Sequence, residues 1–136
     1  MVDVRGIRIG NFFKTPDCDN FRVDEIVKMK MGFYCVKNNI GCNGSYLYGV
    51  VEDLQPIPLT EELLLKCGFN VECYEFQIKE QLLLTIEDFW ILYNTRTNFY
   101  VVIFSNKAFK QIEYLHQLQN IYYDFTGKEL NIKWNG

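Results

Sequence analysis

The sequence predicts an α+β protein, in which a β-rich N-terminal part precedes an antiparallel sheet with one long helix. Three observations lead to this class. Apolar and polar residues alternate within residues 1–55 and again after residue 70, which is the period of half-buried strands. A period of 3.6 residues appears between residues 112 and 125, which indicates an amphipathic helix. Residues 56–69 carry helix signals at both ends and link the two parts.

Composition supports a folded protein with a substantial core. The chain has 136 residues, of which 49% are hydrophobic and 16% are aromatic. This length suffices for one core or two small ones, and the composition is not that of a disordered protein. No apolar run approaches the ~18 residues that a membrane span requires. We therefore expect a protein that does not cross a membrane.

Residues 1–55 are predicted to form a small SH3-like β-barrel, with an open antiparallel meander as the alternative. The apolar runs that indicate strands lie at 7–9, 21–23, 27–31, 33–36 and 46–51. Asn43 and Gly44 give a tight-turn signal before the last run. Four or five short strands with turns at this spacing are typical of small barrels.

Residues 56–69 are predicted to form a linking segment with a short helix. Thr60 has the side chain of an N-cap, and Gly68 suits the left-handed conformation that ends a helix. Two turns are too short to be stable alone, so the helix must dock on the rest of the protein. We expect it to contact both parts of the chain and to bury one side, which consists of Leu63, Leu64 and Cys67. Leu65 faces elsewhere.

Residues 70–136 are predicted to form the α+β subdomain. Strands are expected at 74–78, 82–86, 89–93 and 99–104. For residues 79–89 a helix remains the alternative, because Ile78, Leu82 and Ile86 also fit a helical stripe. The long helix over residues 112–125 should end at Gly127. Alternation of Leu130, Ile132 and Trp134 then predicts a final strand.

Charge and cysteine content restrict the class of partner and the setting. The net charge of −3 disfavours nonspecific binding to nucleic acid, although Lys28 and Lys30 leave one face of a predicted strand. The start of the chain lacks the pattern of a secretory signal. Five cysteines are an odd number without a CxxC pair, so we expect five reduced thiols, a cytoplasmic location and no metal site.

Three sequence blocks suggest a family. They are PIPLTEELLLKCGF at residues 56–69, HQLQNIY at 116–122 with TGKEL at 126–130, and IRIGN at 7–11. In order and spacing these blocks resemble a family of small proteins encoded by gut Bacteroidetes and by their phages or mobile elements. The resemblance does not extend to residues 70–111. It implies a biological setting, and it implies no activity and no catalytic residues.

Two sets of residues are the candidate sites. Glu113, His116 and Asn120 lie side by side on the predicted helix and form a candidate binding face. His116 is the only histidine, so it is also the one candidate for acid–base chemistry. A histidine among polar residues on a helix more often belongs to an ordinary polar face than to a catalytic site. The second set is a predicted binding surface on the N-terminal strands, formed by Tyr34, Tyr46 and Tyr48.

We expect a non-catalytic interaction or accessory protein of the phage or mobile-element type, with a protein as its partner and no cofactor. One alternative is a small enzyme that uses His116 with a carboxylate or thiol. A weaker alternative is a nucleic-acid-binding accessory protein that uses Lys28 and Lys30. The oligomeric state is not predicted.

Overall fold

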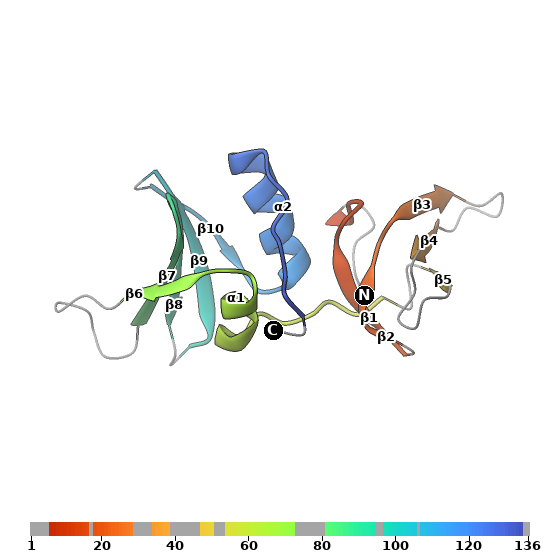
Figure 1. The fold of residues 1–136 in the computed structure, drawn as a ribbon, viewed down its shortest axis with the longest axis horizontal. Helices are drawn as coiled ribbons and strands as arrows, with labels where there is room; N and C mark the ends of the chain where they lie inside the picture. Colours follow the sequence, from red (N-terminus) through yellow and green to blue (C-terminus); the bar gives the residue numbers. More distant parts are fainter. Residues whose placement is uncertain are drawn as a thin grey trace. The chain divides into compact units, whose positions relative to one another are not determined.

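The α+β class is confirmed. The computed structural model describes residues 6–16, 18–28, 34–38, 47–50, 54–72, 81–94, 97–105 and 107–134. Within these ranges it contains ten strands, all in antiparallel sheets, and two helices (Figure 1).

The chain divides into two compact units. Unit 1 consists of Met1–Pro58 and Tyr114–Asn120, and unit 2 consists of Leu59–Glu113 and Ile121–Gly136. Helix α2 (Leu115–Thr126) therefore contributes its first half to unit 1 and its second half to unit 2. The boundaries predicted from sequence, 1–55, 56–69 and 70–136, rest on pattern alone and stay a prediction.

Unit 1 contains two small antiparallel sheets. Strands β1 (Phe12–Thr15) and β2 (Cys18–Arg22) form the first, and β3 (Glu25–Lys28), β4 (Tyr34–Asn38) and β5 (Leu47–Val50) form the second in that order. The described strands form no closed barrel. Their buried cluster consists of Ile7, Phe13, Cys18, Phe21, Val23 and Leu54.

The predicted strand at residues 7–9 is wrong. Asn11 folds the segment before β1 into a turn, because its side-chain Oδ1 accepts a hydrogen bond from the backbone N–H of Arg8 at 2.8 Å. The N–H of Asn11 in turn donates to the carbonyl oxygen of Arg8. Local bonds from an Asn side chain compete with strand pairing in this way.

The expectation of five reduced thiols is wrong for Cys18, which is disulfide-bonded. An odd number of cysteines leaves at least one unpaired, but it does not prevent two of them from pairing. Cys67 is a free thiol, as predicted, and its burial raises its pKa to about 12. A buried thiol with a raised pKa is chemically inert.

The short helix is confirmed as α1 (Glu61–Lys66) in unit 2. The hydroxyl oxygen of Thr60 accepts a hydrogen bond from the N–H of Leu63 at 3.1 Å, and Gly68 has a φ of 92°. The predicted buried side is also confirmed, because Leu63, Leu64 and Cys67 are at most 8% exposed whereas Leu65 is 47% exposed.

Unit 2 is built on a five-stranded antiparallel meander. Its strands are β6 (Asn70–Glu72), β7 (Gln81–Ile86), β8 (Phe89–Asn94), β9 (Phe99–Phe104) and β10 (Lys107–Ile112). Neighbours in sequence are neighbours in the sheet (Figure 1). The predicted strands at 82–86, 89–93 and 99–104 are confirmed, and the helical alternative is wrong for residues 81–89. The predicted strand at 74–78 lies outside the described residues.

Two predictions for the C-terminal part are wrong. The long helix begins at Leu115 and not at Ile112, because Ile112 is the last residue of β10 and pairs with Tyr100. The final strand is absent from residues 128–134. In that segment the N–H of Lys133 donates to the carbonyl oxygen of Lys66, the last residue of α1. The segment therefore hydrogen-bonds to the C-terminal end of a helix and not to a strand.

Candidate functional site

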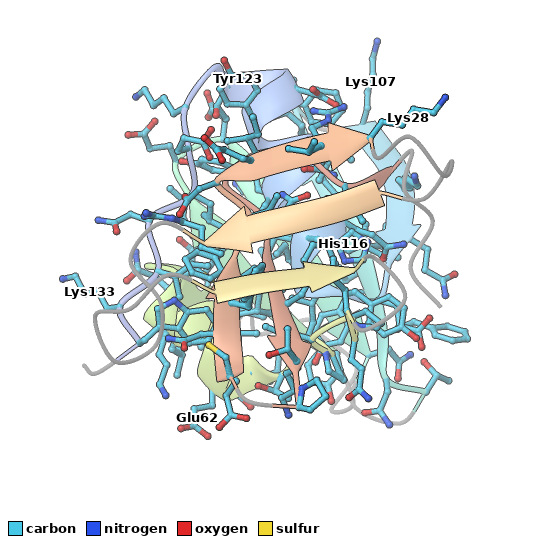
Figure 2. All side chains as sticks on the ribbon, turned by 90° about the vertical axis from the view of Figure 1, so that its right-hand side faces the viewer. Lys28, Glu62, Lys107, His116, Tyr123 and Lys133 are labelled. Atoms are coloured by element: carbon cyan, nitrogen blue, oxygen red, sulfur yellow. The ribbon has the colours of Figure 1, made fainter. Side chains whose placement is uncertain are left out.

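His116 lies in the first turn of α2, and its ring is part of the core of unit 1. Only 8% of the residue is exposed. Its ring lies 4.9 Å from that of Phe13 and 6.1 Å from that of Tyr114, measured between centroids. Figure 2 shows the side chain within the fold, whereas Lys28, Lys107 and Glu62 extend outward.

This environment keeps the imidazole neutral. Its Nδ1 atom is buried and has no hydrogen-bond partner. Burial away from water disfavours the charged form, and it lowers the pKa of His116 to about 4. An imidazole of this kind is a poor general base near neutral pH, where the best catalytic pKa lies close to the working pH.

Two amide side chains one turn further along α2 bind the N-terminal segment of unit 1. Gln119 is 3% exposed. Its Oε1 accepts from the N–H of Phe12 and its Nε2 donates to the carbonyl oxygen of Gly10, both at 2.9 Å. Asn120 accepts from Nδ2 of Asn11 and donates to the carbonyl oxygen of Gly6, both at 2.8 Å. These bonds fix the segment before β1 on the helix.

Glu113, His116 and Asn120, which were predicted to form one group, therefore make separate contacts. His116 packs on rings, Asn120 holds the N-terminal segment, and Glu113 is exposed while its carbonyl oxygen accepts from the N–H of Leu59. Helical spacing placed His116 and Asn120 together, but it did not reveal that backbone groups of unit 1 face Asn120.

The predicted tyrosine surface cannot be compared with side-chain positions. Tyr34 begins β4 and pairs with Lys28, and Tyr48 lies in β5 and pairs with Lys37. Their side chains and the whole of Tyr46 lie outside the described part of the chain, so this surface stays a prediction. Lys28 is exposed on β3, and Lys30 also lies outside the described residues.

The sheet of unit 2 has one face packed on helices. Phe89 meets Tyr122 of α2 edge-on with ring centroids 5.1 Å apart, and Phe104 stacks on Phe125 at 5.2 Å. Phe89 also lies 6.1 Å from Phe69, which follows α1. Because successive side chains of a strand point to opposite faces, residues next to Phe89 and Phe104 in sequence belong to the other face.

We call that other face the outward face. Strand register and alternation assign to it Asn70, Glu72, Leu83, Thr85, Trp90, Leu92, Asn94, Phe99, Val101, Ile103 and Gln111. Leu92 pairs with Leu83 on one side and with Val101 on the other. Trp90 pairs with Ile103. On this face Leu83 and Thr85 are buried, whereas Trp90, Leu92, Val101 and Ile103 are half-buried. Antiparallel sheets with one solvated face usually carry polar residues there, and this sheet has an apolar centre instead.

A small pocket lies on the helix side of the same sheet. It has a volume of about 190 Å³ and is lined by Ile86, Glu87, Asp88, Phe89, Phe104, Tyr122, Thr126 and Lys128. Sites for drug-sized ligands usually measure about 300–1,000 Å³, so this pocket is smaller than a typical ligand site. It lies in unit 2 and contains no part of the predicted His116 group.

No described helix has the length and apolar character needed to span a bilayer. Across the described ranges, no three His, Cys, Asp or Glu side chains are grouped as metal ligands would be. The chain matches no protein-family model, and no curated protein or solved structure resembles it significantly.

Proposed function

We propose that this chain is a non-catalytic protein-interaction protein and that it binds its partner through the outward face. The observation that carries the proposal is the apolar centre of that face, formed by the half-buried Trp90, Leu92, Val101 and Ile103 on the adjacent strands β8 and β9. The helices of unit 2 stabilise the opposite face, so these side chains are not needed to hold α1 or α2.

The composition of the outward face suits a protein partner. Protein interfaces are enriched in aromatic residues and depleted of charge at their centre, with polar residues around the rim. Trp90 lies among aliphatic side chains, Asn94 and Gln111 lie at the margins, and Glu72 is the one ionisable residue among those assigned to the face. Among the described residues assigned to the face there is no lysine or arginine that could bind a phosphate backbone.

Other features of the proposal come from the sequence. An accessory role in a phage or mobile element is proposed from the resemblance of the three sequence blocks. An SH3-like arrangement of the strands in unit 1 is also part of the proposal, and the two antiparallel sheets there support it only at the level of strand content. The enzyme alternative has less support, because His116 is buried and neutral.

Affinity capture from the native host tests the role of the outward face. We would compare the wild-type chain with Leu92→Lys, which places a charge at the centre of the face. Leu65→Lys is the matched control, because Leu65 is 47% exposed on α1 in the same unit. The proposal expects one or more proteins to be captured by the wild type and the control and lost with Leu92→Lys. Equal capture by all three, with folding confirmed by circular dichroism, would contradict it.

A further inference from the structure

We infer that the small pocket on the helix side of the unit 2 sheet binds a small zwitterion, an α-amino acid with a short apolar side chain. The pocket lies on the face opposite the outward face, so this inference goes beyond the proposed function and does not rest on it. Its volume of about 190 Å³ is that of about six water molecules at about 30 Å³ each, which suits a ligand of this size.

Aromatic rings form the apolar wall of the pocket. Phe89 and Phe104 pair across β8 and β9, and their ring centroids lie 6.3 Å apart. Tyr122 of α2 meets Phe89 edge-on at 5.1 Å, and Ile86 completes this wall at the end of β7. Such a wall accepts an aliphatic side chain, because contact with the rings removes apolar surface from water.

The turn between β7 and β8 brings two carboxylates to the pocket. Glu87 and Asp88 form this turn, and both are exposed. The turn is closed by the pairing of Ile86 with Phe89, and the indole N–H of Trp90 donates to the carbonyl oxygen of Glu87 at 3.0 Å. The acidic side of the pocket therefore belongs to a turn whose backbone is fixed on the sheet.

The chain after α2 brings an ammonium group to the same pocket. The hydroxyl oxygen of Thr126 accepts a hydrogen bond from the N–H of Lys128 at 3.1 Å. The same hydroxyl donates to the carbonyl oxygen of Tyr122 at 2.7 Å. These two bonds tie the backbone of Lys128 to the last turn of the helix, so the basic side of the pocket comes from an element other than the acidic side.

The polar groups of the pocket are left unused by the protein. Among the described residues, neither the carboxylates of Glu87 and Asp88 nor the ammonium of Lys128 takes part in an ion pair. They do not pair with each other although they line one pocket. Tyr122 is 9% exposed, and in that part of the chain its hydroxyl has no hydrogen-bond partner, yet this atom is not sealed from solvent. A hydroxyl in this position is satisfied by water or by a ligand.

This arrangement favours a ligand that carries both charges. Glu87 and Asp88 would repel a ligand that has only a carboxylate, and Lys128 would repel one that has only an ammonium group. An amino acid places its ammonium at the turn and its carboxylate at Lys128 and the hydroxyl of Tyr122, where charge-assisted hydrogen bonds form. Because the charged groups are exposed and the ligand is small, we expect a dissociation constant of about 1 mM.

Titration of the full-length chain with L-valine, followed by heteronuclear NMR, tests this inference. Two further probes each lack one charge of valine: isobutylamine lacks the carboxylate, and isovalerate lacks the ammonium group. We expect valine to cause saturable shifts at backbone amides of residues 86–89 and 126–128. Each single-charge probe should bind at least about 10-fold more weakly than valine.

Variants assign each charge of the ligand to one side of the pocket. Lys128→Gln should weaken valine by about 10-fold and should no longer distinguish it from isobutylamine. Glu87→Gln combined with Asp88→Asn should no longer distinguish valine from isovalerate. Tyr122→Phe keeps the ring, and it should weaken valine and isovalerate while it leaves isobutylamine unchanged. Lys133→Gln is the matched control, because Lys133 is exposed in the same C-terminal segment but does not line the pocket.

The outcomes are decisive in either direction. A lack of saturable shifts with valine up to about 20 mM, or shifts that map away from the pocket, overturns the inference. Wild-type binding of isobutylamine or isovalerate that equals the binding of valine overturns the zwitterion as the ligand, and so does unchanged valine binding by Lys128→Gln. None of these measurements involves the outward face, so their failure would leave the proposed function standing. Equal capture of host proteins by Leu92→Lys would likewise leave this site standing.

Discussion

The two halves of α2 are held by different kinds of interaction. In unit 1, the first half adds side-chain amide bonds to apolar and ring packing, because Gln119 and Asn120 bind backbone groups of residues 6–12 while His116 packs on Phe13. In unit 2, the second half uses aromatic rings, because Tyr122 and Phe125 pack on Phe89 and Phe104. The long-range amide bonds of this helix thus lie in its first half, whereas ring packing occurs in both halves.

This difference has consequences for how each half responds to substitution. The hydrophobic stabilisation from burying rings is non-directional and scales with the buried apolar area. Buried amide bonds add little net stability when they are made, but they are costly when one partner is removed. The comparison predicts large losses from truncated rings, smaller losses from truncated amides, and a pH dependence confined to the half that carries His116.

The largest effect is expected from Phe89→Ala in unit 2. Phe89 is 1% exposed, and its ring lies within 6.3 Å of those of Phe69, Phe104 and Tyr122. Removing it should cost about 3–5 kcal/mol of unfolding free energy, measured by urea denaturation. Tyr123→Ala is the control on the same helix, because Tyr123 is 47% exposed and should change stability by less than about 0.5 kcal/mol. A loss below about 1 kcal/mol for Phe89→Ala would mean that rings do not hold the second half.

The next effect is a pH dependence from His116. Burial lowers its folded-state pKa to about 4, against about 6.5 in the unfolded chain. The unfolded chain therefore binds the extra proton between these values, and stability is fully present above pH 6.5 and falls as the pH approaches 4. The loss should total about 3 kcal/mol.

His116→Leu isolates this term, because the variant cannot titrate at that position. The stability of the wild type relative to His116→Leu should decline between pH 6.5 and 4 and stay constant above pH 6.5. An NMR titration provides an independent measurement, since no other histidine overlaps. Titration of the ring near pH 6.5 would show that the imidazole is solvated, and it would contradict the placement of His116 in the core of unit 1.

A smaller effect is expected from Asn120→Ala. The substitution removes two hydrogen bonds and leaves the amide of Asn11 and the carbonyl of Gly6 without these partners. Asn11 is 2% exposed, so the cost should be about 1–3 kcal/mol. A double-mutant cycle with Asn11→Ala should show a loss smaller than the sum of the two single losses, because both changes remove the same bond. Strict additivity would contradict a direct pair.

Local signals explain what the sequence predicted well. The cap at Thr60 and the left-handed glycine at position 68 act within a few residues, so both ends of α1 were readable. The strands at 82–86, 89–93 and 99–104 followed from short apolar runs. β10 was missed because its alternation is broken by a bulge between Ala108 and Lys110, and Ile112 also fitted the helical stripe.

Long-range partners explain what the sequence did not predict. The polar face of α2 contains Gln119 and Asn120, whose partners lie 107 to 114 residues earlier in the chain. Nothing in the local pattern distinguishes an amide that faces water from one that faces a distant backbone. The same limit applies to Lys133, whose N–H binds the end of α1 and not a strand.

The smallest expected effect concerns the start of α2, which lacks a Ser, Thr, Asp or Asn cap. Tyr114 precedes the helix, and Oε1 of Gln117 accepts a hydrogen bond from its N–H at 3.1 Å. This is one half of a capping box, in which the third helical residue reaches back to the cap residue. Gln117→Ala should cost about 0.5–1 kcal/mol, and hydrogen exchange at the N–H of Tyr114 should become faster.

Gln117→Glu keeps an acceptor and places negative charge at the positive end of the helix, so it should match or exceed wild-type stability by a few tenths of a kcal/mol. If both variants lose the same amount of stability, the amide acts through its other contacts, and the first half of α2 depends on Gln119 and Asn120 without a cap.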